Sequence, residues 1–219
     1  MTVLRLHTSD GVDLAAETAG SDGAPRAAAV LLHPHPKMGG DMRTPVPDHL
    51  FRTLPASGIE VLRFDFRGAG GSGGSHGGGG PEVADAEAAV AELSGLTSLP
   101  VWLVGWSFGA DVSLRVTDTA VAGWVPVAPP LQQPGIDASG GDPRPAHLLV
   151  PEHDQFCSPG RAERVTAGWE STTVERIPGA DHFLAGRLGA LTDLVVGALT
   201  GDRHASSDRG GEGQASRPV

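Results

Sequence analysis

The five residues Gly105-Trp106-Ser107-Phe108-Gly109 are the segment of this sequence whose types and spacing point most clearly to chemistry. They follow the apolar run Pro100-Val101-Trp102-Leu103-Val104, which is typical of a short buried strand. A strand that ends in G-x-S-x-G and continues into a helix is typical of a nucleophile elbow, with the serine in a strained turn between close-packed glycines. The pattern predicts that Ser107 is a nucleophile and that the amide of Phe108 stabilises an oxyanion. In a chain with 32 glycines, a turn whose serine only caps the helix is the alternative.

A serine nucleophile needs a general base, and His182 is the histidine best placed for that role. It lies in Pro178-Gly179-Ala180-Asp181-His182-Phe183, directly after the last expected strand, and catalytic groups of doubly wound sheets follow the carboxyl ends of strands. A capping or surface histidine is the alternative. The other histidines follow other strands (His33, His35, His153), lie in a glycine-rich stretch (His76) or occupy strand, helix or tail positions (His7, His49, His147, His204).

The base needs an acid to orient it, and the sequence favours Asp154 for this. Asp154 follows the apolar strand that includes Leu148-Leu149-Val150, between Ser107 and His182 in the chain. Glu152 is closer to that strand and is the competing acid. Asp181 adjoins the base in sequence, so we expect its side chain to point elsewhere and to cap the last helix.

A second amide is required to complete an oxyanion hole, and the segment His33-Pro34-His35-Pro36 ends the strand that should supply it. Proline has no N–H, so His35 is the only donor between the two prolines. Metal binding by His33 and His35 is the alternative. Two histidines alone do not make a zinc site, and we predict no metal.

Strand-like and helix-like segments alternate along the chain. Two alternating segments around Asp10-Gly11 predict a hairpin, and the later apolar runs predict buried parallel strands. The pattern predicts an α/β fold of one domain: a mostly parallel, doubly wound sheet with an N-terminal antiparallel hairpin and no large cap. The expected strands are 3–8, 12–18, 27–32, 60–66, 100–105, 122–127, 146–150 and 172–177, and the expected helices are 47–56, 82–93, 107–118, 160–168 and 184–199.

Three segments lie outside this pattern. Residues 68–80 are rich in glycine and contain a formal G-x-G-x-x-G, but no helix opens directly after it, so we predict a mobile stretch and no dinucleotide cofactor. Residues 129–145 read as a loop that carries part of a substrate pocket or is a surface excursion, and both readings stay open. Residues 201–219 have almost no apolar side chains, which predicts a disordered tail after a domain of residues 1–200.

Composition and net charge argue against some classes of partner and cellular location. A formal net charge of −10 argues against a nucleic-acid partner, and one cysteine in 219 residues suits a reducing compartment. The N-terminus does not have the pattern of a signal peptide, and no apolar run approaches membrane-spanning length. We therefore expect a cytoplasmic protein without a membrane partner, and the oligomeric state stays open.

Taken together, these motifs resemble the α/β-hydrolase superfamily over roughly residues 3–199. Within it the chain is similar to small bacterial hydrolases without a large cap, which share an HPHP…GG segment (33–36 with Gly39-Gly40), an F-D-F-R-G-x-G-x-S segment (64–72), the G-x-S-F-G elbow and Gly-Ala-Asp-His-Phe (179–183). The resemblance implies a triad of Ser107, Asp154 and His182, with the amides of Phe108 and His35 as the oxyanion hole.

The resemblance also implies a reaction class: a serine esterase or thioesterase that acts on a small acyl substrate and needs no cofactor. Two alternatives stay open at this point. One is acyl transfer, cyclisation or dehydration on the same three residues. The other is a ligand-binding protein that keeps the fold without catalysis. The physiological substrate is beyond the sequence.

Overall fold

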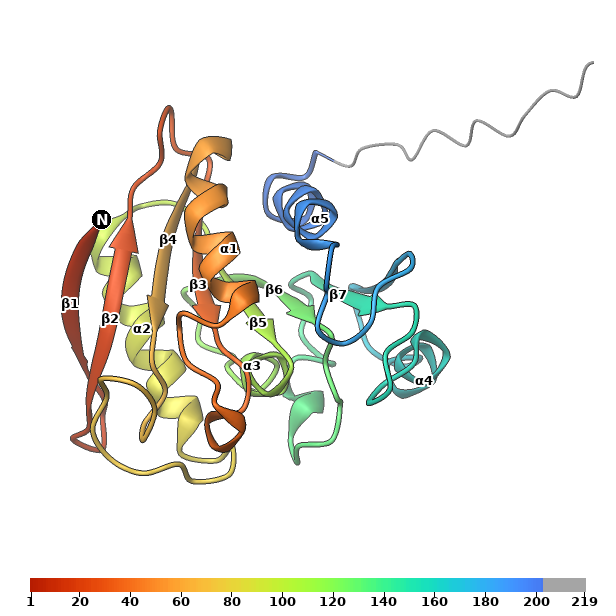
Figure 1. The fold of residues 1–219 in the computed structure, drawn as a ribbon, viewed down its shortest axis with the longest axis horizontal. Coiled ribbons are helices and arrows are strands. Elements are labelled where there is room, and N and C mark those ends of the chain that lie inside the picture. Colours follow the sequence, from red (N-terminus) through yellow and green to blue (C-terminus); the bar gives the residue numbers. More distant parts are fainter. Residues whose placement is uncertain (203–219) are drawn as a thin grey trace, which may run out of the picture.

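The structure is a computed structural model, and it describes residues 1–202. Strands and helices alternate, and eight strands form one sheet (Figure 1). The strands are β1 (Thr2–His7), β2 (Asp13–Ala19), β3 (Ala27–Leu32), β4 (Ile59–Phe64), β5 (Val101–Trp106), β6 (Val121–Val127), β7 (Ala146–Pro151) and β8 (Thr172–Ile177). The helices are α1 (Pro45–Thr53), α2 (Glu82–Leu96), α3 (Phe108–Ser113), α4 (Pro159–Val165) and α5 (Leu188–Thr200), with short 3₁₀ helices at Pro36–Met38, Leu54–Ser57 and Ile136–Ala138.

The strand order is β1-β2-β4-β3-β5-β6-β7-β8. The hairpin strands β1 and β2 pair antiparallel, β2 also pairs antiparallel with β4, and the pairs from β4 to β8 are all parallel. This confirms the predicted α/β class with an N-terminal antiparallel hairpin. The two longest connections, 65–81 and 128–145, hold no more than one 3₁₀ turn, which agrees with the prediction of no large cap.

Helices cover the sheet on both faces, and this explains the continuous apolar runs in its centre (Figure 1). Side chains of α1 and α5 pack in one core, and side chains of α2, α3 and α4 pack in the other. Every residue of β3 and β5 is buried. A parallel strand that is covered on both sides has no face for polar residues, so these two strands read as unbroken apolar segments.

The order of the parallel strands in the sheet changes direction at β3: β4 lies on one side of β3, and β5 to β8 follow on the other side. The chain reaches β5 by a crossover through α2. Loops that leave β3 and β5 therefore diverge to opposite sides, which opens a crevice at the carboxyl edge of the sheet. His35 follows β3 and Ser107 follows β5, so the topology places both at this crevice.

Several element bounds differ from the sequence-based prediction. The helix after the elbow is α3, which ends at Ser113 rather than at Asp118, because the amides of Arg115 and Val116 turn back to carbonyls three residues earlier. The last helix begins at Leu188 rather than at Leu184, after a turn in which Leu184 has φ 58°.

The glycine-rich segment 68–80 also differs from the expected mobile stretch, because side chains of two acids hold its backbone. Asp65 accepts the amide of Gly71, and Glu82 accepts the amides of Gly77 and Gly79 at 2.6 and 2.7 Å. The segment therefore follows a defined path beside the crevice.

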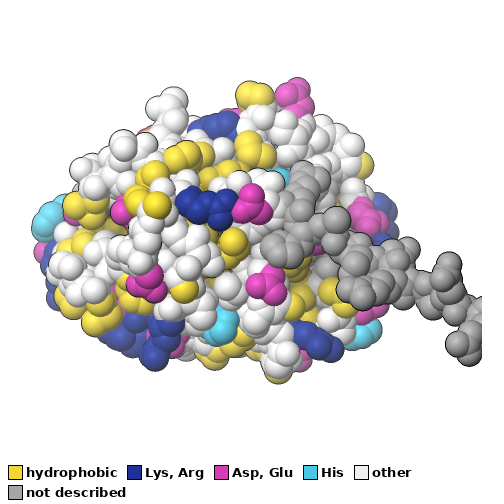
Figure 2. Space-filling view, turned by 90° about the horizontal axis from the view of Figure 1, so that it is seen from above, with side chains coloured by type: hydrophobic (Ala, Val, Ile, Leu, Met, Phe, Trp, Pro, Cys, Tyr) yellow, Lys and Arg dark blue, Asp and Glu magenta, His cyan; other side chains and the backbone are white. Residues whose placement is uncertain are grey.

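On the face drawn in Figure 2, Lys and Arg side chains lie among Asp and Glu side chains and form no continuous basic area. No helix within residues 1–202 is long and apolar enough to cross a bilayer. The predicted tail, 201–219, lies outside the described residues except for Gly201 and Asp202, and Asp202 forms an ion pair with Arg26.

Candidate active site

Ser107 lies in the sharp turn between β5 and α3, with φ 55° and ψ −117°. A positive φ is strained for a side-chain-bearing residue, and it persists only where the surroundings impose it. The flanking glycines allow this turn. A Cβ on Gly105 would lie 2.3 Å from the carbonyl oxygen of Gly109, and a Cβ on Gly109 would lie 2.5 Å from that of Leu32. The elbow predicted from the sequence is therefore present as a local geometry.

The structure brings Ser107, His182 and Asp154 together. The Oγ of Ser107 lies 2.9 Å from Nε2 of His182, and Nδ1 of the same ring lies 2.8 Å from Oδ2 of Asp154. Because Asp154 faces Nδ1, the neutral ring carries its proton there and leaves Nε2 free to accept from the serine hydroxyl. This chain of hydrogen bonds is suited to deprotonating the hydroxyl.

Neighbouring backbone and side-chain groups hold the acid and the base in place. The other oxygen of Asp154, Oδ1, accepts the amides of Phe156 and Cys157 at 2.7 and 3.1 Å. The indole N–H of Trp106 donates to the backbone carbonyl of His182 at 3.2 Å. Both Asp154 and His182 are buried, so water does not compete for their mutual hydrogen bond.

The two competing acids lie elsewhere. The carboxylate of Glu152 is exposed and accepts the amide of Gly179 at 2.8 Å. The carboxylate of Asp181 accepts the amide of Phe183 at 3.1 Å. The expectation that Asp181 caps the last helix is wrong, because α5 begins only at Leu188 and has Arg187 at its cap position.

Two backbone amides line the same pocket as Ser107 and donate to nothing within residues 1–202. They belong to Phe108, the first residue of α3, and to His35, which caps the 3₁₀ helix Pro36–Met38. The amide of Ser107 itself is used, because it donates to the carbonyl of Val127. An anion in the pocket would therefore find two unpaired donors, one on each side of the switch between β3 and β5.

His33 has a structural place and no free nitrogen. Its Nδ1 lies 2.6 Å from the carbonyl oxygen of Pro34, and its Nε2 accepts the amide of Phe66 at 2.9 Å. Burial lowers the pKa of this ring to about 4, so it is neutral at ordinary pH. With both nitrogens occupied, His33 has no lone pair left for a metal ion, and no group of three potential metal ligands occurs in the described part of the chain.

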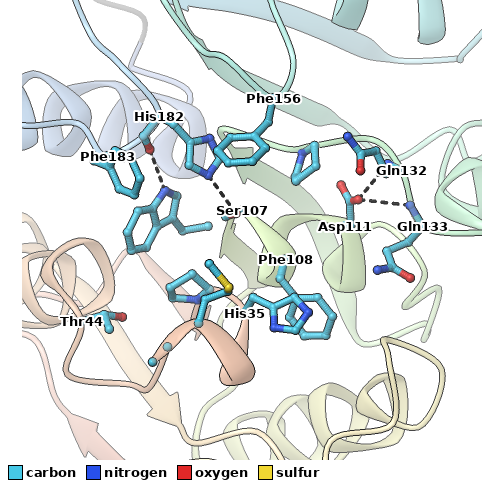
Figure 3. A pocket seen from close by; sticks show the side chains of 16 residues that line it. His35, Thr44, Ser107, Phe108, Asp111, Gln132, Gln133, Phe156, His182 and Phe183 are labelled. Carbon is cyan, nitrogen blue, oxygen red and sulfur yellow. Dashed lines mark hydrogen bonds between the residues drawn. The ribbon is translucent and has the colours of Figure 1, made fainter.

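The pocket around Ser107 has a volume of about 400 Å³ (Figure 3). In the close-up, His182 and Phe183 lie on one side of Ser107, and Asp111, Gln132 and Gln133 lie on the other. Its lining is formed by Pro34, His35, Met38, Gly39, Gly40, Thr44, Trp106, Ser107, Phe108, Asp111, Pro130, Gln132, Gln133, Phe156, His182 and Phe183.

Asp111 is the lining residue that sequence reasoning most clearly missed. Its buried carboxylate accepts the amides of Leu131, Gln132 and Gln133 at 2.9, 2.9 and 3.2 Å, which fixes one wall of the pocket. Burial raises the pKa of this carboxyl, and the three amides oppose the shift. One signal was available: Asp111 stands four residues after Ser107, which on a helix places it on the same side one turn later.

Cys157 is the only cysteine and lies beside the acid, but it is a poor nucleophile. The side chain is buried, and burial raises the pKa of the thiol, so it stays protonated at neutral pH.

The chain is similar in sequence to one family of hydrolases and to one curated protein. The model of a family described as Hydrolase_4, serine aminopeptidase, S33, matches residues 23–139. Uncharacterized protein RP471 of Rickettsia prowazekii (strain Madrid E) is 38% identical over 90 residues, which are 40% of this chain and 38% of that protein. The match thus spans well under half the length of this curated relative.

Solved structures match over nearly the whole chain. An alpha-beta serine hydrolase homologue from Coxiella burnetii is 29% identical, with a TM-score of 0.80 over 90% of this chain and 97% of the other. XC6422 from Xanthomonas campestris, described as an a/b serine hydrolase without lid, is 26% identical, with a TM-score of 0.79 over 92% and 94% of the two chains. These similarities cover much more of the chain than residues 23–139, the segment that the family model matches.

Proposed function

The chain belongs to the Hydrolase_4 (serine aminopeptidase, S33) family of α/β-hydrolases, and on that basis we propose that it cleaves carboxylic esters or thioesters through an acyl-enzyme on Ser107. The observation that supports this most directly is the hydrogen bond of 2.9 Å between Oγ of Ser107 and Nε2 of His182. A serine that only caps a helix has no need of a buried imidazole–carboxylate pair behind it.

In the first half-reaction His182 takes the hydroxyl proton of Ser107 on Nε2, and Oγ attacks the carbonyl carbon of the substrate. The carbonyl oxygen becomes an oxyanion, which accepts hydrogen bonds from the amides of Phe108 and His35. The carbon–oxygen (or carbon–sulfur) bond to the leaving group then breaks. The departing alcohol or thiol takes the proton from Nε2 of His182, and the acyl group stays on Ser107.

In the second half-reaction water replaces the leaving group. His182 removes a proton from the water molecule, whose oxygen attacks the acyl carbon, and the same two amides stabilise the second oxyanion. Collapse returns the proton to Oγ of Ser107 and releases the carboxylic acid. Throughout, Asp154 keeps the proton of His182 on Nδ1 and stabilises the charged ring.

A fluorophosphonate probe and p-nitrophenyl butyrate test this function together. Wild-type protein should be labelled covalently and should hydrolyse the ester, and Ser107→Ala should do neither. Ser98→Ala, at an exposed serine beyond the opposite end of β5 from Ser107, is the matched control and should behave as the wild type. Failure of the wild type to react with the probe, or equal labelling of Ser107→Ala, would rule the assignment out.

A further inference from the structure

The pocket around Ser107 carries almost no charge. Its lining contains no Lys, Arg or Glu, and the one carboxylate in it belongs to Asp111. That carboxylate already accepts three backbone amides, of Leu131, Gln132 and Gln133. A cationic group of a substrate would therefore find no unpaired carboxylate here, and an anionic group would find no cationic side chain.

The polar side chains that remain beside Asp111 are neutral carboxamides. Gln132 and Gln133 stand on a loop that is fixed from two sides, by Asp111 and by Arg161. The guanidinium of Arg161 donates to the carbonyls of Pro130 and Leu131 at 2.7 and 3.2 Å. The side-chain amides of both glutamines form no hydrogen bond within residues 1–202, so they stay available to a ligand.

Apart from Thr44 and the residues of the proposed site, the rest of the lining consists of glycine and apolar side chains, and these form its exposed edge. Met38, Phe156 and Phe183 line the pocket and are 84%, 48% and 57% exposed, and they are among the few large apolar side chains on the surface of residues 1–202. Exposed apolar side chains gathered around a cleft mark a site for an apolar ligand. Here they surround the nucleophile itself.

We propose that this pocket selects uncharged esters, an inference that rests on the proposed function. A carboxylate or an ammonium group that enters the pocket loses water without gaining a partner of opposite charge, which is unfavourable. Neutral esters with an apolar acyl or alkyl group lose nothing of this kind and gain contact with the apolar edge. The same reasoning disfavours peptides with a free N-terminus, because their α-amino group would be left unpaired.

Three esters of similar size test the selectivity: propyl butyrate, propyl hemisuccinate and butyrylcholine. They carry no charge, a negative charge on the acyl side, and a positive charge on the alcohol side. We expect kcat/KM for propyl butyrate to exceed that of both charged esters by at least ~30-fold, the ratio that about 2 kcal/mol of unpaired charge produces. Ratios within threefold of one another would overturn the inference.

A charge placed in the pocket should shift this preference. Gln132→Lys should raise the ratio of kcat/KM for hemisuccinate over butyrate at least ~10-fold, because the new ammonium pairs with the carboxylate. Ser98→Lys adds the same charge at an exposed position away from the pocket and should leave the ratio unchanged. An unchanged ratio in Gln132→Lys would contradict the placement of the substrate against this wall.

Two results distinguish a failure of this inference from a failure of the proposed function. If Ser107 reacts with a fluorophosphonate and propyl butyrate is hydrolysed without preference over the charged esters, only the inference fails. If neither the probe nor any of the three esters reacts, the proposed function fails and the inference with it.

A second feature, independent of the pocket's charge, lies beside the two unpaired amides. The ring of His76 packs against the rings of both residues that carry them, with centroids 4.7 Å from His35 and 5.3 Å from Phe108. The rings of His35 and Phe108 are 5.0 Å apart. Three segments that are separate in the chain thus meet in one aromatic cluster.

Glu82 lies beside the ring of His76 and holds the backbone that follows it. The side chain of Glu82 is fully buried, and its Oε1 lies 2.9 Å from Nδ1 of His76, although the two atoms are not aligned as in a good hydrogen bond. The same carboxylate accepts the amides of Gly77 and Gly79. Glu82 therefore fixes the glycine-rich segment directly after His76, and before His76 the segment is fixed by the hydrogen bond from the amide of Gly71 to Asp65.

We infer that His76 is a positioning residue: its ring fixes the distance between the amides of His35 and Phe108 and so sets the geometry of the oxyanion hole. A change there acts on the transition state, where the oxyanion exists, more than on the bound ester. It should therefore appear in kcat and not in KM.

His76→Ala and His76→Phe test this role with p-nitrophenyl butyrate and with phenylboronic acid, which forms a tetrahedral adduct. His76→Ala should lower kcat by ~10-fold and weaken the boronic acid in the same proportion, with KM within twofold. His76→Phe keeps an aromatic ring and should restore most of both losses. A merely structural role would lower the melting temperature while kcat stayed unchanged, and that result, or no rescue by phenylalanine, would overturn the inference.

Discussion

The carboxylate of Asp154 and the ring of His182 meet at 2.8 Å across 28 positions of sequence. Their contact follows from the pairing of β7 with β8, in which Pro151 and Ile177 are partners at the carboxyl ends of the two strands. Asp154 follows one strand by three residues and His182 follows the other by five. Loops that leave neighbouring parallel strands at the same edge must run side by side, so sheet register decides which acid reaches the imidazole.

Replacing this acid should damage catalysis more than binding. Asp154→Asn should lower kcat by roughly 10³-fold with KM little changed, because an amide N–H facing Nδ1 favours the wrong tautomer of His182. Steady-state kinetics on p-nitrophenyl butyrate measure both constants. Glu152→Gln, two residues earlier and exposed, is the matched control and should keep its activity. The reverse order of effects would mean that Glu152 is the acid.

The elbow glycines should be sensitive to a single methyl group. Gly109→Ala places a Cβ 2.5 Å from the carbonyl oxygen of Leu32, so the elbow must move away from β3. We expect a loss of about 1–3 kcal/mol in the free energy of unfolding and a fall in kcat. Gly95→Ala, in α2, meets nothing within 4 Å and should instead stabilise the protein by about 0.5–1 kcal/mol. Urea unfolding distinguishes the two, and equal effects would contradict this account of the turn.

Buried His33 should make stability depend on pH. Burial lowers the pKa of its ring to about 4 from the usual 6.5, so between these values the unfolded chain binds a proton that the folded chain does not. The free energy of unfolding should therefore fall as pH drops through this window, by up to about 3 kcal/mol. Urea unfolding at several pH values within the window measures it.

A variant identifies His33 as the source of this dependence. His33→Gln should flatten the slope of stability against pH, even though it lowers stability at neutral pH. His153→Gln, at an exposed histidine, should keep the full slope. If the slope of His33→Gln matched that of the wild type, another group would be responsible.

Removing the carboxylate of Asp111 should loosen the wall that carries Gln132 and Gln133. Asp111→Ala leaves three amides without their acceptor and should cost about 2–4 kcal/mol in the free energy of unfolding. KM for propyl butyrate should rise more than kcat falls, because the wall contacts the bound ester rather than the oxyanion. A larger effect on kcat than on KM would indicate that Asp111 acts on Ser107 instead.

The fold and the elbow were accessible from the sequence because their signals are local. The apolar runs of β3 and β5 indicate strands that are buried on both faces, and the structure confirms the predicted sheet. The turn at Ser107 needs only residues from Gly105 to Gly109 and the strand before them. The proximity of Asp154 and His182 needed one further step, the rule that loops after parallel strands share an edge.

The walls of the pocket were not accessible in this way, because long-range contacts place them. Asp111 fixes residues some twenty positions later in the chain, in a loop whose composition carries no pattern. The sequence predicts a mobile glycine stretch around His76. Composition does not reveal that buried Glu82 accepts the amides of Gly77 and Gly79, directly after His76. Element ends such as that of α3 depend on turns that form only in the folded chain.

The most direct test of the central claim is to detect the acyl-enzyme itself. Wild-type protein is mixed with excess p-nitrophenyl butyrate, quenched in acid within the first turnover and examined by intact and peptide mass spectrometry. The account predicts one butyryl group, on the peptide that contains Ser107, and no adduct in Ser107→Ala. Hydrolysis of the ester with no adduct on the protein, or an adduct on Cys157 in place of Ser107, would contradict it.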